Sequence, residues 1–112
     1  MLRASGWYVC TAPIDLRCGV DRLLLQIRDQ LGQDPFAGTA FVFRNRAGTR
    51  IKVVLADVHG VWLCVRRLHD GRFVWPRIGD ACWQLDARQF EWLSSGFDWQ
   101  RMSLSKLHAT AI

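Results

Sequence analysis

Tight turns divide the stretch from Phe41 to Pro76, and their spacing constrains the fold more than any other feature of the chain. The runs between the turns are rich in β-branched and aromatic residues, which favour strands. Gly48, Gly60 and Gly71 supply turn positions at intervals that suit hairpins. Because antiparallel neighbours need only short loops, the stretch predicts four short strands that pair one after another.

A helix is predicted from the apolar residues between Val20 and Leu31, which recur at the spacing of one helical face. Gly32 follows at a position where helices commonly end. Alternation gives the predicted sheet one apolar and one basic face, with Phe41 and Phe43 on the apolar side. The helix carries the only long apolar stripe in the sequence, so we expect it to pack on the apolar face of the sheet.

Three further segments complete the predicted elements. Residues 7–12 and 81–85 have the composition of strands. Asp86 and Gln89 have the spacing of a capping box at the start of a short helix, which runs to about Ser95 and buries Phe90 and Leu93. From residue 102 onward the sequence shows no firm periodicity.

The sequence therefore predicts a single α+β domain over residues 1–101, followed by a mobile tail over residues 102–112. We expect an antiparallel sheet of about five strands, with one long helix packed on it and a short C-terminal helix. No run approaches the roughly 18 apolar residues of a membrane span, and no export signal is recognisable. These features predict a cytoplasmic protein without a membrane partner. Its four cysteines are expected to be unpaired thiols: Cys10, Cys18, Cys64 and Cys82.

Positive charge is concentrated in one segment. Between Arg44 and Arg77, eight arginine and lysine residues accompany only two aspartates, a net charge of +6, whereas the whole chain carries +5. The period of two places Arg44 and Arg46 on one side of their strand, and Arg50 and Lys52 on the polar side of the next. Pairing the two strands across their turn then merges both sets into one solvent-exposed patch.

This basic surface predicts contact with nucleic acid, because cations that neutralise backbone phosphates release the counterions of those phosphates. A solvated strand also carries charges, and charges at an edge prevent aggregation, but solubility is served by mixed signs. Nucleic-acid contact is therefore the favoured interpretation. The residues expected to make it are Arg44, Arg46, Arg50, Lys52, Arg66, Arg67 and Arg72.

Other chemistry finds less support in the sequence. The acidic residues are scattered, so we predict no catalytic cluster and interpret them as turn and cap residues. His59, His69, Cys64 and Cys82 lack the close cysteine pair typical of a zinc site, and no phosphate-binding glycine motif occurs. We therefore expect neither a metal nor a cofactor. Trp62, Phe73 and Trp75 could stack on bases, but core packing is the favoured role.

Several motifs in register resemble the accessory transposition protein, TnpB type, of the bacterial insertion sequence sixty-six family. The resemblance extends over residues 12–99. The motifs that carry it are Asp15-Leu16-Arg17-Cys18-Gly19, Asp34-Pro35-Phe36, Phe41-Val42-Phe43-Arg44, Ile51-Lys52, Arg67-Leu68, and Phe73 with Trp75-Pro76. It implies a helper that is encoded beside a larger transposase and has no active site of its own.

Residues and resemblance together predict a non-catalytic accessory factor for DNA transposition, which contacts DNA at the transposon ends through its basic surface. The alternative is an adaptor that docks on the larger transposase of the same element without binding DNA itself. Salt-sensitive DNA binding in the absence of the transposase would favour the first function. Complex formation in a nuclease-treated extract would favour the second.

Overall fold

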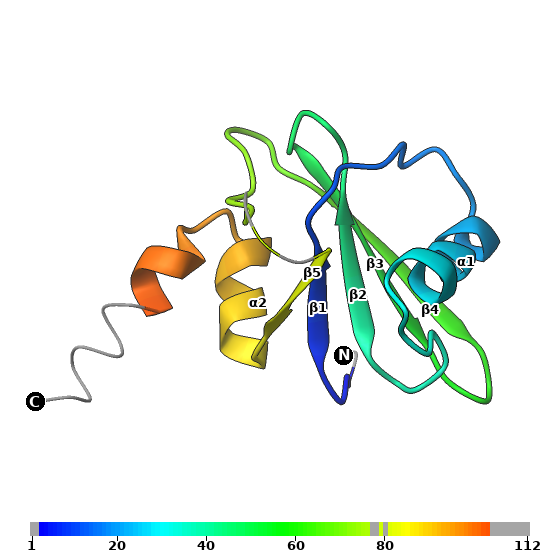
Figure 1. Ribbon diagram of the computed structural model, residues 1–112. Coiled ribbons are helices and arrows are strands. Elements are labelled where there is room, and N and C mark those ends of the chain that lie inside the picture. The colour runs from blue at the N-terminus through cyan, green and yellow to red at the C-terminus, as the bar shows by residue number, and fades with distance from the viewer. Residues whose placement is uncertain (1–2, 77–78, 80, 104–112) are drawn as a thin grey trace, which may run out of the picture.

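A five-stranded sheet with the strand order β4-β3-β2-β1-β5 organises the chain (Figure 1). The computed structural model describes residues 3–76, 79 and 81–103. Its elements are β1 (Trp7–Cys10), α1 (Val20–Gln30), β2 (Ala40–Arg44), β3 (Arg50–Ala56), β4 (Val61–Arg67), β5 (Cys82–Leu85) and α2 (Ala87–Ser94). A further helical segment covers residues 99–103. The α+β class and the five strands agree with the prediction.

The sheet is mixed rather than wholly antiparallel, which corrects the prediction. Strands β2, β3 and β4 form the expected antiparallel succession, and β5 lies antiparallel to β1. Strand β1, however, pairs with β2 in parallel. The physical reason is the connection between them: residues 11–39 contain α1, and a crossover of this length returns the chain in the same direction. Gly48, with a φ of 74°, lies in the left-handed region that the β2–β3 turn requires.

The fourth strand predicted for the stretch up to Pro76 is absent, since the described residues 72–76 form no strand. This segment instead crosses the end of the sheet, where the backbone N–H of Phe73 donates to the carbonyl of Gly48 at 2.8 Å. Trp75 lies buried, and its Nε1 donates to the carbonyl of Cys10 at 2.8 Å. Burial of Phe73 and Trp75 removes their large apolar surfaces from water, which stabilises this unpaired conformation.

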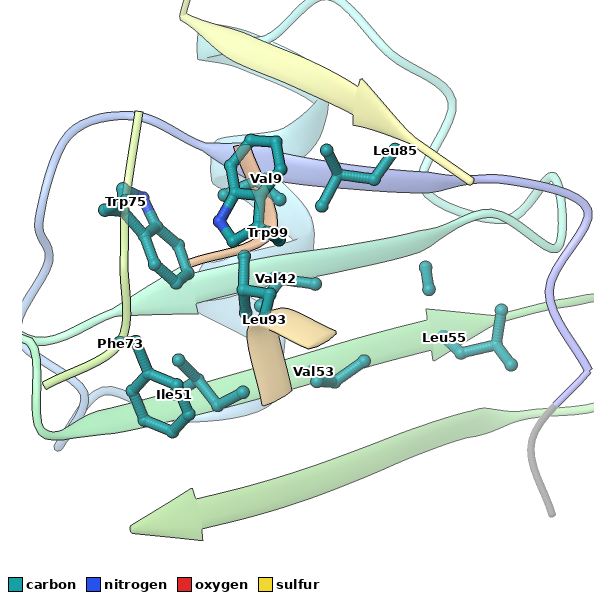
Figure 2. Packing of buried hydrophobic residues seen from close by; sticks show 11 residues of the cluster. Val9, Val42, Ile51, Val53, Leu55, Phe73, Trp75, Leu85, Leu93 and Trp99 are labelled. Atoms are coloured by element: carbon teal, nitrogen blue, oxygen red, sulfur yellow. The ribbon is translucent and has the colours of Figure 1, made fainter. Parts of the chain in front are cut away.

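Both faces of the sheet are covered, so the expected division into an apolar and a basic face is wrong for its centre. On one face, Leu23 and Ile27 of α1 pack against Phe41, Phe43 and Val54, as predicted for this helix. On the other face a larger apolar core brings the inward residues of β1, β2 and β3 against Leu93 and Trp99 (Figure 2). Central strands buried on both faces are apolar almost throughout, and β2 and much of β3 have this composition.

The helices also refine the prediction. With 11 residues, α1 is an ordinary helix of about three turns rather than a long one. The capping box of α2 is confirmed: Asp86 Oδ1 accepts from the Gln89 N–H at 2.7 Å, and Gln89 Oε1 accepts from the Asp86 N–H at 2.9 Å. Leu93 is fully buried, while Phe90 is half-buried and stacks on Trp7. None of the helices in the described ranges is long and apolar enough to cross a membrane.

Only the first two residues of the expected tail, residues 102–112, belong to the described part of the chain. Residues 102 and 103 continue the last helical segment, and the hydroxyl of Ser103 accepts from Gln89 Nε2 at 2.9 Å. Residues 104–112 lie outside the described residues.

All four cysteines lie within the described part of the chain, and no disulfide joins any two of the four.

Candidate nucleic-acid interface

The seven predicted basic residues gather at one end of the sheet. Strand β2 ends at Arg44, β3 begins at Arg50 and β4 ends at Arg67, and antiparallel pairing sets these strand ends side by side. Arg72 joins them because Phe73, its neighbour, is hydrogen-bonded to the β2–β3 turn. We call this set the basic end: Arg44, Arg46, Arg50, Lys52, Arg66, Arg67 and Arg72.

The basic end is not a single flat face, and the prediction of one shared patch for Arg44, Arg46, Arg50 and Lys52 is wrong. Arg44 is paired with Ile51, whereas Lys52 is paired with Phe43. Directly opposed residues share a face of the sheet, so Arg44 lies on the side of α2 and Lys52 lies on the side of α1. Alternation assigns the residues of each strand to its two faces, but it does not fix the register between strands.

Arg44 has a structural role as well as a charge. Its Nη2 donates to the carbonyl of Thr11 at 3.2 Å, and its guanidinium lies 5.9 Å from the centroid of the Trp75 ring. Its buried Nε has no hydrogen-bond partner among the described residues. Burial, with a smaller contribution from the charge of Arg46, lowers the pKa of Arg44. The side chain therefore connects β2 to the segment after β1 and is only partly available to a ligand.

Lys52 is also held by the protein. Its Nζ donates to the carbonyl of Cys18 at 3.2 Å, just before α1 begins, and its side chain is half-buried. The remaining five members of the basic end are exposed: Arg46, Arg50, Arg66, Arg67 and Arg72. These five arginines, rather than Arg44 and Lys52, offer free guanidinium groups to solvent.

A cleft of about 690 Å³ opens beside the basic end, between the β2–β3 turn and residues 72–76. Arg44, Arg46 and Arg72 line it together with Trp83, and Asp98 is the acidic residue among the described ones that line it. Sequence reasoning did not single out Trp83, although its position in a predicted strand was an available signal. Three guanidinium groups beside an indole ring suit an anion or a stacked base better than a cation.

The aromatic residues that were considered for base stacking divide into two kinds. Phe73 and Trp75 are buried, which confirms the core interpretation for both. Trp62 is 61% exposed on β4, so the core interpretation is wrong for this residue. Trp62 lies on β4, which is an edge strand of the sheet that the described residues form.

Several acidic residues lie in turns or caps, as predicted, whereas Asp21, Asp29 and Glu91 lie inside helices. Asp15 is paired with Arg17 at 2.8 Å, and the hydrogen bonds from Arg17 lower the pKa of Asp15 to about 2. Asp57 accepts from the backbone N–H groups of His59 and Gly60, which lowers its pKa. In residues 3–76, 79 and 81–103, no three histidine, cysteine or acidic side chains lie close enough to hold a metal ion. Cys64 and Cys82 stand on the two opposite edge strands.

Comparison with known proteins agrees with the motifs. The uncharacterized protein y4hO of Sinorhizobium fredii (strain NBRC 101917 / NGR234) is 38% identical over 93 residues, which cover 83% of this chain and 81% of that protein. The uncharacterized protein y4jC of the same organism is 32% identical over 94 residues, or 84% of this chain and 80% of that protein. No solved structure gives a significant match. The model of the IS66 Orf2-like protein family matches residues 5–104, so the chain belongs to that family.

Proposed function

We propose that this protein is a non-catalytic accessory factor for DNA transposition, and that its basic end contacts the phosphate backbone of DNA. Membership of the IS66 Orf2-like family supports the accessory role. The contact with DNA rests on one observation: five exposed arginines, from the β2–β3 turn, β3, β4 and the segment after β4, gather at one end of the sheet.

The charges around these arginines favour an external anion. The ion pairs among the described residues join Arg17 to Asp15 and Arg28 to Asp29, and neither includes a member of the basic end. Among the described residues, Asp15, Asp70 and Asp98 are the acidic neighbours on this side, and Asp15 is already paired with Arg17, so they are too few to balance the cations. A phosphate backbone supplies a row of anions at regular spacing and gains free energy from counterion release.

The arrangement of the exposed arginines favours contact with DNA phosphates over recognition of the base sequence. The arginines come from strand ends and turns that point to different sides, whereas readout of base edges uses a helix or a strand pair placed in a groove. Contacts to phosphates fix the position of a protein on a duplex but carry no sequence information. We therefore expect weak binding with little sequence preference.

Binding titrations of labelled duplex DNA at several salt concentrations test this function. If each of the five exposed arginines neutralises one phosphate, log K falls with log salt at a slope of roughly −4 to −5. The double variant Arg46→Ala/Arg50→Ala should flatten the slope by about two units. Both side chains are exposed, so this pair is preferable to Arg44 and Lys52, which donate hydrogen bonds to backbone carbonyls.

The matched control is Arg3→Ala/Arg88→Ala, which removes two exposed arginines at the opposite end of the sheet. It should keep nearly the whole salt dependence, although the net charge of the protein falls equally. Two results would refute DNA contact at the basic end: no binding by the wild type at low salt, or equal slopes for the two double variants.

The protein partner that we propose is the larger transposase of the same element, which would supply the chemistry that an accessory factor lacks. The family assignment supports this partner. Co-purification of the two proteins from a nuclease-treated extract tests it, because a complex bridged only by DNA would be lost. Loss of the complex after that treatment would leave DNA as the sole link between them.

A further inference from the structure

Strand β4 is an open edge with an unusual composition. All seven of its residues are exposed, including Val61 and Leu63 at 41%, Trp62 at 61% and Val65 at 60%. Figure 1 shows β4 as the outer strand of the sheet. The core side chains labelled in Figure 2 include Ile51, Val53 and Leu55 of the neighbouring strand β3 but none of β4. Proteins usually protect edge strands with proline, bulges or charge, because an open edge pairs with other strands. In β4, charge is confined to Arg66 and Arg67 at one end.

Two backbone hydrogen bonds determine which groups of β4 face outward. The N–H of Leu68 donates to Thr49 at 3.0 Å, and the N–H of Asp57 donates to Gly60 at 2.9 Å. Hydrogen-bonded pairs alternate along an antiparallel ladder, so the even-numbered residues of β4 direct their N–H and C=O groups toward β3. The corresponding groups of Val61, Leu63, Val65 and Arg67 therefore point to the open edge.

We propose that β4 pairs with β4 of a second copy of this chain, antiparallel and about a two-fold axis at Cys64. A two-fold axis makes the same surface serve both copies. The outward groups form a ladder only when odd-numbered residues oppose odd-numbered ones. Pairing of the whole strand then places Val61 opposite Arg67, Leu63 opposite Val65, and Cys64 opposite Cys64 of the other copy.

Charge complementarity selects a second copy in this orientation. Antiparallel pairing in this register places the two Arg66 four residues apart along the strands and the two Arg67 six residues apart, whereas parallel pairing would bring four cations together. Each Arg66 lies opposite the exposed Trp62 of the other copy on the same face, where a guanidinium and an indole attract each other. Each Arg67 approaches the turn that contains Asp57, whose hydrogen bonds keep it ionised.

The pairing of two copies has a consequence for the proposed contact with DNA. The basic end lies where β4 finishes, so a two-fold axis through the middle of β4 would place two basic ends at opposite ends of one ten-stranded sheet. Such a dimer could hold two segments of DNA at the same time. This consequence rests on the proposed function, whereas the pairing itself does not.

Sedimentation equilibrium of the full chain, together with mild oxidation, tests the pairing. The wild type should have twice the 12.9 kDa mass of one chain at high micromolar concentration. Oxidation by dioxygen should join the two opposed Cys64 thiols in a disulfide, with two protons and two electrons passing to the oxidant. Non-hydrogen-bonded pairs are close enough for such a bond, and Cys64→Ser should abolish the cross-link while keeping the dimer.

Two variants separate pairing from folding. Val65→Pro removes an N–H that faces the open edge and not β3, a position where an edge strand tolerates proline, and it should give a monomer. Leu63→Lys should weaken the dimer at least tenfold, while Leu25→Lys, on the exposed side of α1, should leave it intact. Circular dichroism spectra like that of the wild type would show that the variants are folded.

Several outcomes would overturn the pairing: a monomeric wild type, a dimer that persists in folded Val65→Pro and Leu63→Lys, or a cross-link through a cysteine other than Cys64. A monomer whose β4 instead binds an acidic, extended segment of the transposase would also overturn it. The DNA titration gives an independent answer, because Val65→Pro keeps all five exposed arginines. A monomeric wild type that binds DNA refutes only the pairing, and a dimeric wild type without DNA binding refutes only the proposed function.

Discussion

The centre and the edge of the sheet have similar sequences but opposite environments. Strand β2 reads AFVFR and has four buried residues, whereas β4 reads VWLCVRR and has none. Both contain apolar residues on both faces, so composition does not separate them. Their place in the sheet does: among the described residues, α1 and α2 cover the two faces near the centre, and neither helix buries any residue of β4. This apolar edge is the surface for which we propose pairing with a second copy of the chain.

The largest expected effect comes from replacing one aromatic residue in each of the two regions. Phe43 is fully buried in β2, so Phe43→Ala should lower the free energy of unfolding by about 3 to 5 kcal/mol. Trp62→Ala on β4 should lower it by less than about 1 kcal/mol in the monomer, because surface changes are usually small. Urea denaturation at a protein concentration low enough to avoid association measures both. Similar midpoints for the two variants would mean that β4 is covered in solution.

A second test makes the same comparison within α1. Ile27 is fully buried against the sheet and Leu25 is half exposed, so the two aliphatic residues differ mainly in environment. Ile27→Ala should cost about 2 to 5 kcal/mol, whereas Leu25→Ala should cost well under about 1 kcal/mol. Urea midpoints again provide the measurement. An equal cost for the two would show that α1 does not pack on the sheet through Ile27.

Local patterns in the sequence predicted the elements that depend on local physics. The α1 segment follows from helical spacing, the β2–β3 hairpin from Gly48 and its neighbours, and the α2 start from Asp86 with Gln89. Each of these features is determined within about ten residues, so no distant partner is needed to recognise it. The clustering of the basic residues at one end of the sheet also follows, because the strands that end there are consecutive hairpin partners.

Features that depend on distant partners could not be predicted in this way. The parallel pairing of β1 with β2 depends on where α1 returns the chain. The opposite faces of Arg44 and Lys52 depend on a register that alternation within one strand leaves open. Phe73 and Trp75 have the spacing of a strand, yet both are buried in the core cluster without pairing as a strand. The open edge of β4 depends on the order of all five strands.

The smallest expected effect concerns the β3–β4 turn, which joins the covered strand β3 to the edge strand β4. Asp57 accepts backbone hydrogen bonds from His59 and Gly60, and these bonds lower its pKa in the folded protein. The stabilisation from the ionised carboxylate is therefore fully present above about pH 4 and is lost as the pH falls through the lowered pKa. Asp57→Asn keeps an acceptor oxygen but loses the charge, so its urea midpoint should lie slightly below that of the wild type at neutral pH. The difference should vanish in acid, and it should be smaller than that of either core variant because Asp57 is exposed to solvent. A difference of constant size across the whole pH range would show that the charge of Asp57 does not stabilise the turn.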